Sequence, residues 1–438
     1  VIGAREFLIA YNINLNTTDK NAATDIAFEL REKGRVARTP TSSPFYYKGD
    51  ILYYQKEHFP CGSCDFIAKT FEQLVEHCSK EHNYDLKELL SEEIEDFNQI
   101  IGQKVKKPGK FKYCKAIGWY VDEYKRSQIS INLTNYKITP PHVVLEEARK
   151  IASQRGLIVT GSEVVGLIPY EAILEAGRFY LKSQHKSPHV PIQEIIQTAV
   201  ISMGLNDVQT FDINKKIIGL PKYNKNSFIN LSIANFTDEV SKDTPAPGGG
   251  SVSALCGALA GALASMVSNI SYNKLEDYNI KEKLLYIAEK SQNIKYQLLQ
   301  NIDDDANAFN SYLDALRLPK NNEQETTIRE IKIQEGLKHA INIPLKTASL
   351  SLEVMNLALD VAQIGLEASI TDVAVACQCA YVGVEGGIYN ALINLKNISD
   401  TKYIEKIKNQ CVELTQNAKI VLKKCTEYIY HKLDINIT

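Results

Sequence analysis

Four side chains in the first third of the chain have the types and spacing of a metal site. The set is Cys61, Cys64, His77 and His82. Two cysteines on a turn and two histidines about one helical turn apart can close a tetrahedron around Zn²⁺. The pattern therefore predicts a structural zinc site. The alternatives are a site that has lost its metal and one in which Cys78 replaces a ligand.

The charge around this motif argues against one common use of zinc fingers. Between Glu57 and Ile100 there are 11 acidic residues, three lysines and no arginine. Affinity for nucleic acids comes mainly from neutralised phosphates, and this surface would repel them. We therefore predict a structural or interaction module, with Phe66, Phe71 and Leu74 as its core, and no nucleic-acid partner.

One acid in the second half interrupts an apolar helix face. The segment 295–316 is predicted as a helix, and its apolar stripe is Ile302, Ala306, Phe309, Leu313 and Leu316. Asp305 points into this stripe, whereas Asp303 and Asp304 turn toward solvent. A buried carboxyl is costly unless it is paired or functional, and burial raises its pKa toward values that suit proton transfer. Asp305 is the candidate catalytic residue, the alternative being an acid paired across the bundle.

A glycine-rich loop precedes another predicted helix, 252–270. Gly248, Gly249 and Gly250 let a ligand approach the backbone, and Ser251 is a suitable N-cap. The free N–H groups of the helix start favour an anion or a polar ring edge. No Gly-Lys-Ser/Thr follows, so the loop is not a nucleotide P-loop. It is a candidate binding loop, or simply a helix cap.

Three polar residues near the end of the chain complete the candidate site. Asn390 and Asn394 share one face of a predicted helix with small residues, where they either line a pocket or bond between helices. Asp372 lies in Ser369-Ile-Thr-Asp372, which fits a capping box at the start of that helix.

The elements that must position these residues fall into two parts. Strands alternate with helices in 1–211, interrupted at 48–107 by the zinc-finger-like insertion, and helical periodicity fills 227–438. The Lys/Asn-rich segment 212–226 is the expected linker. The predicted fold is an α+β multidomain protein: an α/β sandwich subdomain with a small insertion, followed by an all-α bundle.

Composition places the chain in a reducing compartment. The net charge is −2, which offers no field to attract nucleic acids or a membrane surface. The longest apolar run, 254–267, covers 14 residues and is too short to span a bilayer. Nine cysteines, an odd number in a long chain, fit the cytoplasm better than a disulfide framework. We predict a cytoplasmic protein without a membrane partner.

The second half resembles formiminotetrahydrofolate cyclodeaminases. The resemblance rests on APGGGSVSA (246–254), IDDDANAF (302–309), LPKN (318–321), IPLKTA (343–348) and ITDVAVA with GGIYNALINL (370–395). It implies closure of 5-formiminotetrahydrofolate to 5,10-methenyltetrahydrofolate with loss of ammonia, with tetrahydrofolate as the carrier of the reacting group. The family's catalytic aspartate falls on Asp305. The resemblance also implies a homo-oligomer with interfacial sites.

Parts of the first half are similar to the C-terminal subdomain of glutamate formiminotransferases. The motifs are GAREFLIAYNINL (3–15), AIGWYVDEY (116–124), ISINLTNYKITPPHV (129–143) and GSEVVGLIP (161–169). The resemblance implies a folate-binding surface that includes Glu163, for a folate with or without a polyglutamyl tail. A Gly-Ser-Glu turn after a buried strand would place this carboxylate at the end of a sheet, where it can bond the amino-pyrimidine edge of a pterin.

The same resemblance sets a limit on the expected activity. The family's catalytic histidine lies in a preceding subdomain that has no counterpart here. We therefore expect formiminotransferase activity only if that subdomain is present. The alternative function for the whole chain is a non-catalytic folate-binding or zinc-finger scaffold protein.

Overall fold

The computed structural model describes residues 5–91, 93–221 and 227–435. The start of the 3–15 motif and residues 222–226 of the expected linker lie outside this range. The chain divides into two compact units: residues 1–180 with 192–220, and residues 181–191 with 221–438. The first part of the expected linker folds with the first unit, because β10 (Ile217–Ile218) pairs in parallel with β9 (Ile168–Pro169).

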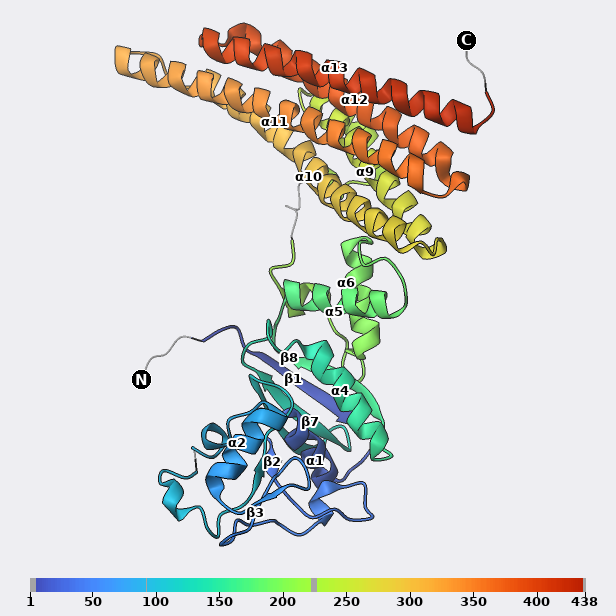
Figure 1. The fold of residues 1–438 in the computed structure, drawn as a ribbon. Coiled ribbons are helices and arrows are strands. Elements are labelled where there is room, and N and C mark those ends of the chain that lie inside the picture. Colours follow the sequence, from blue (N-terminus) through green and yellow to red (C-terminus); the bar gives the residue numbers. More distant parts are fainter. Residues whose placement is uncertain (1–4, 92, 222–226, 436–438) are drawn as a thin grey trace. The chain divides into compact units, whose positions relative to one another are not determined.

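The first unit is built on a four-stranded sheet with the order β6-β7-β1-β8 (Figure 1). Its strands are β1 (Ile9–Leu15), β6 (Cys114–Val121), β7 (Arg126–Leu133) and β8 (Val159–Val165), and every neighbouring pair is antiparallel. The helices α1 (Lys20–Leu30) and α4 (Pro141–Gln154) contact each other and the sheet. The remaining helices of this region are α5 (Tyr170–Ser183), α6 (Ile192–Met203) and α7 (Ile213–Lys216).

Alternation along the strands explains why one face of the sheet is buried. Cys114 and Ala116 of β6 point inward, whereas the exposed fractions of Ile117 and Trp119 are 49% and 56%. The helices lie on the inward face, since a Cβ at Gly118 would meet the backbone of Thr24 in α1 at 2.2 Å. The opposite face is free of α1 and α4.

The insertion leaves and rejoins this unit through a short neck. There β2 (Arg35–Val36) pairs antiparallel with β5 (Lys106–Lys107). Within the insertion, the hairpin of β3 (Phe59–Pro60) and β4 (Ile67–Ala68) is followed by α2 (Phe71–His82), the strand–strand–helix order of a zinc finger. The helix α3 (Leu86–Leu90) and the short 3₁₀ turns η1 (Tyr46–Lys48) and η2 (Phe97–Gln99) complete it.

The insertion has its own apolar core. Its buried members include Tyr54, Phe71, Leu74, Leu86 and Leu90. The core also takes in Ala37 and Val105 at the neck, so the enclosed region begins before residue 48. The insertion is therefore a small folded module rather than an open loop.

Buried ion pairs fasten the neck to α1 and α4. Arg35 bonds Asp25 at 3.0 Å, and Arg155, at the end of α4, bonds Asp25 at 2.7 Å and Glu29 at 2.7 Å. Asp25 and both arginines are less than a tenth exposed. Losing one partner from such a network leaves a buried charge uncompensated, which costs about 3–5 kcal/mol.

The second unit is a bundle of long helices (Figure 1). Its main helices are α9 (Gly249–Lys274), α10 (Tyr278–Leu316), α11 (Glu323–Ile364), α12 (Ile370–Asn394) and α13 (Thr401–Lys432), preceded by α8 (Ile233–Val240) and the 3₁₀ turn η3 (Phe228–Asn230). Two further 3₁₀ turns, η4 (Glu367–Ser369) and η5 (Leu395–Asn397), flank α12. α9 contacts α10, α11 and α12, and small residues line its contacts.

One bundle helix is longer than the sequence indicated. We expected the apolar run 254–267 to be too short for a membrane span, but the helix that contains it, α9, has 26 residues and reaches the length and apolarity of one. Of its most apolar window, 61% is buried inside the bundle, as for a core helix.

Candidate functional site

Asp305 lies where α10 crosses the start of α9. The Ser251 hydroxyl is 3.2 Å from Oδ2 of Asp305 and 2.9 Å from the carbonyl oxygen of Ile302. Ser251 is fully buried, whereas Asp305 is half-buried. Of the expected stripe, Ile302 and Ala306 are buried, but Leu316 is 37% exposed, so the stripe packs only over its first turns.

The surroundings of Asp305 favour its protonated form. Burial raises the pKa of this carboxyl above its ordinary value, and hydrogen bonding to Ser251 offsets part of that effect. Desolvation penalises the charged form because the carboxylate loses water without gaining a cation. A carboxyl in this state can accept a proton and return it near neutral pH.

The glycine loop makes room for this carboxyl. A Cβ at Gly250 would lie 2.2 Å from Oδ1 and 2.5 Å from Cγ of Asp305. At Gly249 it would lie 3.3 Å from Nδ2 of Asn390, a tight but tolerable contact. Gly250 is therefore required for the close approach of α9 to Asp305, and the loop joins Asp305 and Asn390 into one site. Gly248 is the N-cap residue of α9.

Gly250→Ala should displace Asp305 and lower turnover by at least tenfold. Overpacking of this kind typically costs about 1–3 kcal/mol of stability. Thermal unfolding would measure the loss of stability, and the reaction that the family resemblance implies, ammonia release from 5-formiminotetrahydrofolate, would measure the loss of turnover. In Gly249→Ala the added methyl meets only the end of the flexible Asn390 side chain. This variant should lose less turnover and less stability than Gly250→Ala. Equal losses in the two variants would contradict the specific contact with Asp305.

The structure corrects our assignment of the helix start. We expected Ser251 to be the N-cap, but α9 begins at Gly249, so Ser251 lies in the first turn and its side chain points to α10. The anion that approaches the start of this helix is the carboxyl of Asp305 itself. The positive end of the helix dipole therefore acts on a residue of the chain.

The two neighbouring acids differ from our expectation and from each other. Asp303 accepts hydrogen bonds from the Ser227 hydroxyl and, at 2.7 Å, from the Phe228 backbone N–H. It thus anchors the segment that leads into the bundle rather than facing solvent. Asp304 is half-buried and accepts a bond of 3.1 Å from Gln300, one turn earlier on α10.

Asn390 and Asn394 have separate roles in the bundle. The side chain of Asn394 donates a hydrogen bond of 3.2 Å to the carbonyl oxygen of Ala340 in α11. Pro344, inside α11, has no N–H, so it leaves this carbonyl four residues earlier without its helical partner. Asn394 therefore supplies the hydrogen bond that the proline cannot. The proline inside a helical sequence pattern was the signal from which this role could have been predicted. Asn390 lies near the glycine loop, and its side chain donates a hydrogen bond of 2.7 Å to the Gly386 carbonyl.

Asp372 lies far from these residues within the chain. It is eighteen residues before Asn390 on α12, or about 27 Å along the axis. The expected capping box is not formed, because the side chain of Ser369 makes no cap hydrogen bond. The structure brings Gly249, Gly250, Ser251, Asp305 and Asn390 together and leaves Asp372 apart.

In the first unit, Glu163 lies inside β8 and not on a turn as expected. The strand registers place Ile117, Ser130, Asn12 and Glu163 in one cross-strand row. This row is on the sheet face that α1 and α4 leave uncovered. The side chain of Gln209 donates a hydrogen bond of 2.7 Å to the Glu163 carboxylate. A carboxylate in a polar row beside an apolar side chain suits a flat, hydrogen-bonding ring.

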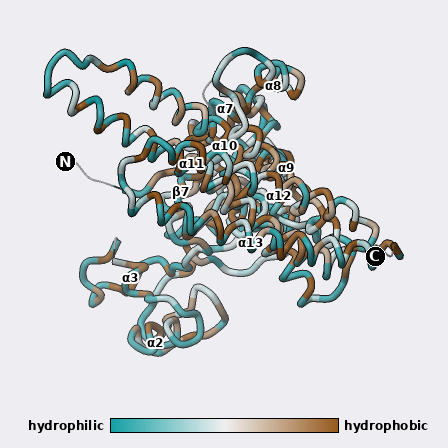
Figure 2. The backbone as a smooth tube through the Cα atoms, turned by 90° about the horizontal axis from the view of Figure 1, so that it is seen from above, coloured by the Kyte–Doolittle hydropathy of each residue, from teal (hydrophilic) through white to brown (hydrophobic). Residues whose placement is uncertain are grey.

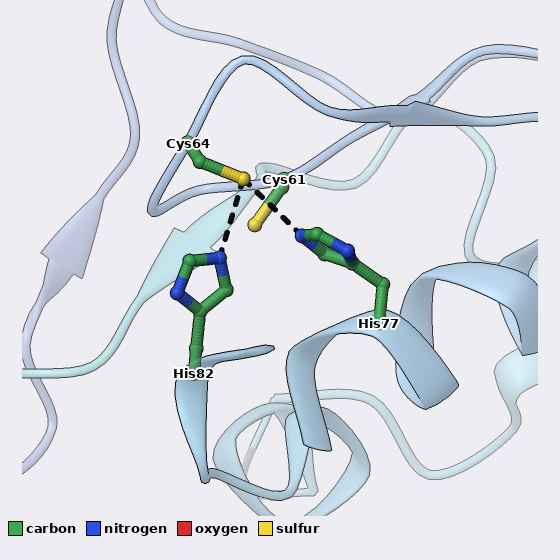
Figure 3. A group of neighbouring side chains, drawn as sticks. All are labelled: Cys61, Cys64, His77 and His82. Carbon is green, nitrogen blue, oxygen red and sulfur yellow. Dashed lines mark hydrogen bonds between the residues drawn. The ribbon is translucent and has the colours of Figure 1, made fainter. Parts of the chain in front are cut away.

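The four predicted metal ligands converge in the insertion (Figure 3). Their donor atoms all lie within 4.8 Å of one another. Sγ of Cys64 is 3.2 Å from Nε2 of His77 and 3.2 Å from Nε2 of His82. Bonds of about 2.0–2.3 Å to a central Zn²⁺ fit donor atoms this close together. Two thiols and two imidazoles are a donor set that zinc prefers.

Of two neighbours of the cluster, Phe66 differs from the sequence interpretation, and Cys78 bears on the alternative ligand. Phe66 is 41% exposed and stacks on the His77 ring at 4.0 Å instead of joining the core. Cys78 is buried and bonds the Tyr84 hydroxyl at 3.1 Å. The geometry therefore favours His77 and His82 over Cys78 as ligands.

The lysines at the end of the insertion and just after it are partly paired. Lys106 bonds Glu93, and Lys110 lies 2.5 Å from Glu147. Lys106 and Lys107 also form β5. These pairings give that part of the segment a structural role.

Comparisons with known proteins match both units. A family model described as formiminotransferase-cyclodeaminase matches residues 232–413, and one described as formiminotransferase domain matches residues 90–221. A solved structure of formiminotetrahydrofolate cyclodeaminase from Thermotoga maritima has a TM-score of 0.40 at 25% identity and covers 47% of this chain and 96% of its own.

Similar relatives bear the corresponding names. Formimidoyltransferase-cyclodeaminase of Rattus norvegicus is 32% identical over 96% of this chain, which spans 65% of that relative's length. The Dictyostelium discoideum protein of the same name is 31% identical over 99% of this chain and 67% of its own length. Methenyltetrahydrofolate cyclohydrolase of Methylorubrum extorquens is 33% identical over 47% of this chain and 99% of its own. The chain belongs to the formiminotransferase-cyclodeaminase family.

Proposed function

We propose that the bundle catalyses the cyclodeaminase reaction, 5-formiminotetrahydrofolate to 5,10-methenyltetrahydrofolate plus ammonia. The observation that carries the proposal is Asp305, a desolvated carboxyl held against a glycine loop in a chain of this family. We also keep, as a proposal, the sequence-based division into 1–211, a linker 212–226 and 227–438, although the two compact units have different bounds.

The chemistry needs two proton movements that one carboxyl can serve. N10 attacks the formimino carbon and forms the new C–N bond, while Asp305 takes the N10 proton. Asp305 then returns a proton to the departing amine as the bond between carbon and that nitrogen breaks. Gly249, Gly250 and Asn390 form the polar surface beside this carboxyl, where the substrate would lie. We retain Gly248, Asn394 and Asp372 as sequence-based candidates, the last one reachable only from another copy of the chain.

For the first unit we propose a folate-binding role. The support is the polar row that includes Glu163 on the sheet face opposite α1 and α4, together with the formiminotransferase family model that matches this part of the chain. Transfer of the formimino group is proposed only for the protein that also contains the subdomain with the family's catalytic histidine.

An ammonia-release assay on the purified chain tests the enzyme proposal directly. The chain should release one ammonia per methenyltetrahydrofolate formed, because both products come from the same tetrahedral intermediate. Folate binding without turnover would instead support the non-catalytic scaffold. The methenyl product has a conjugated chromophore, so its absorbance gives an independent rate.

A second candidate reaction is hydrolysis of methenyltetrahydrofolate. It is favoured by the similarity to the cyclohydrolase of Methylorubrum extorquens, which covers 47% of this chain and 99% of that relative. The same assay separates the two reactions, because the cyclohydrolase would consume the methenyl compound without releasing ammonia. Faster loss of methenyltetrahydrofolate than of the formimino substrate would reverse our assignment.

We further propose that Cys61, Cys64, His77 and His82 bind a structural Zn²⁺. The support is their donor set and the mutual distances of their donor atoms. Bound there, the metal would hold the β3–β4 hairpin to α2 and stabilise the module by coupling binding to folding. It has no part in the proposed cyclisation, whose residues lie in the other unit.

We also propose that the protein is a homo-oligomer in the cytoplasm. Val375, Val382 and Tyr389 repeat every seven residues on α12 and are 52%, 49% and 62% exposed, and Leu259 of α9 is 51% exposed. Figure 2 shows apolar residues along both helices. A second copy of the bundle would cover such a stripe. The described cysteines are all free thiols, which suits a reducing compartment.

A further inference from the structure

The hydroxyl of Ser251 has two acceptors within reach and a single proton to donate. Oδ2 of Asp305 is 3.2 Å away and the carbonyl oxygen of Ile302 is 2.9 Å away. Ser251 is completely buried, so water does not compete for this proton. The Ile302 carbonyl belongs to the interior of α10, where the backbone already supplies a helical partner. It therefore tolerates both the presence and the absence of the hydroxyl bond.

We propose that Ser251 is a positioning residue whose hydroxyl follows the charge on Asp305. When Asp305 is ionised, the hydroxyl donates to Oδ2, because a bond to a charged acceptor is the stronger one. When Asp305 holds the N10 proton, the hydroxyl turns to the Ile302 carbonyl. The hydrogen bond thus stabilises the carboxylate selectively, which favours release of the proton from Asp305 to the leaving amine.

The groups that face Asp305 support this role. α9 presents Gly250 and Ser251, neither of which titrates. On α10 itself, Asp303 is bonded to Ser227 and Phe228, and Asp304 is bonded to Gln300. In the described part of the chain, no ion pair includes Asp305. Ser251 is therefore the group best placed to offset the effect of burial on the carboxyl.

The inference rests on the proposed cyclodeaminase function, but its first test does not. Titration of the Asp305 carboxyl by carbon NMR, without substrate, should show the pKa rise by about one unit in Ser251→Ala, because a hydrogen bond to a charged group is lost. Ser268→Ala is the matched control: Ser268 is also buried in α9 and bonds a helix carbonyl, that of Ala264 at 2.8 Å. It should leave the Asp305 titration unchanged.

Kinetics provide the second test. In Ser251→Ala the acidic limb of the pH profile of kcat/KM should move to higher pH by the same unit. At pH values below this limb, kcat/KM should fall about tenfold. Ser251→Thr, which keeps the hydroxyl, should restore most of this loss. A shifted NMR titration without a kinetic shift would sink the catalytic proposal alone. An unshifted titration in a folded Ser251→Ala variant, judged by its thermal unfolding, would overturn the role of Ser251.

Discussion

Replacing Asp305 with Asn should lower cyclodeaminase turnover by about 10²–10⁴-fold while folate still binds. This is the usual contribution of a general acid–base. The amide keeps the shape of the carboxyl and much of its hydrogen bonding with Ser251, but it cannot take the N10 proton. Ammonia release gives the rate, and calorimetric titration with the folate substrate gives the affinity.

Asp304→Asn is the matched control for this variant. Asp304 is the preceding residue of α10 and bonds only Gln300 among the described residues. Its exchange should change turnover less than twofold, since its side chain is bonded within α10 and the loop glycines approach Asn390 and Asp305 instead. Comparable losses at both positions would show that the reacting carboxyl had been assigned wrongly. Normal turnover in Asp305→Asn would remove this residue from the mechanism.

The same substitution should also affect stability in a pH-dependent way. Burial raises the pKa of Asp305 in the folded state, so the folded chain binds this proton more tightly than the unfolded chain does. Stability from this group is present below the unfolded pKa and is lost as the pH rises through the folded value. Asp305→Asn should therefore be at least as stable as the parent at neutral pH, and the advantage should disappear in acid.

Zinc removal should have the second large effect, confined to the insertion. The double variant Cys61→Ser with Cys64→Ser should lose about one zinc per chain, measured by atomic absorption. Zinc-finger peptides gain roughly 10–16 kcal/mol on binding zinc, far more than a core of this size supplies. Amide exchange within 51–105 should consequently become fast, whereas the bundle should remain protected.

The ammonia assay decides whether the metal has any catalytic role. Turnover in the double variant should stay within about twofold of the parent, because Asp305 and its neighbours belong to the other unit. His58→Asn, an exposed histidine of the insertion outside the cluster, should retain both zinc and turnover. Zinc retained in the double variant would refute the proposed ligands, and loss of turnover with an intact bundle would give the module a functional role.

Local patterns identified much of this protein before the fold was known. The spacing of Cys61, Cys64, His77 and His82 indicated a cluster because ligand positions on a turn and one helix are set by local geometry. The 3.6-residue period placed Asp305 on the buried side of α10 for the same reason. Alternating strand and helix patterns indicated the α+β organisation, and helical periodicity indicated the helical second half. The bounds were less accurate: the helix predicted over 295–316 begins at Tyr278.

Contacts between distant segments could only be decided by the tertiary structure. Ser251 was taken for a cap, because its own sequence does not show that α10 supplies the acceptor of its hydroxyl. Asp303 was assigned to solvent, although Ser227 and Phe228 pack over it. Glu163 was placed on a turn, whereas pairing with β1 extends β8 through it. The sequence by itself determined the candidate residues and the helix faces on which they lie, since type and period are local. Their partners depend on how helices cross and strands pair, which only the folded chain decides.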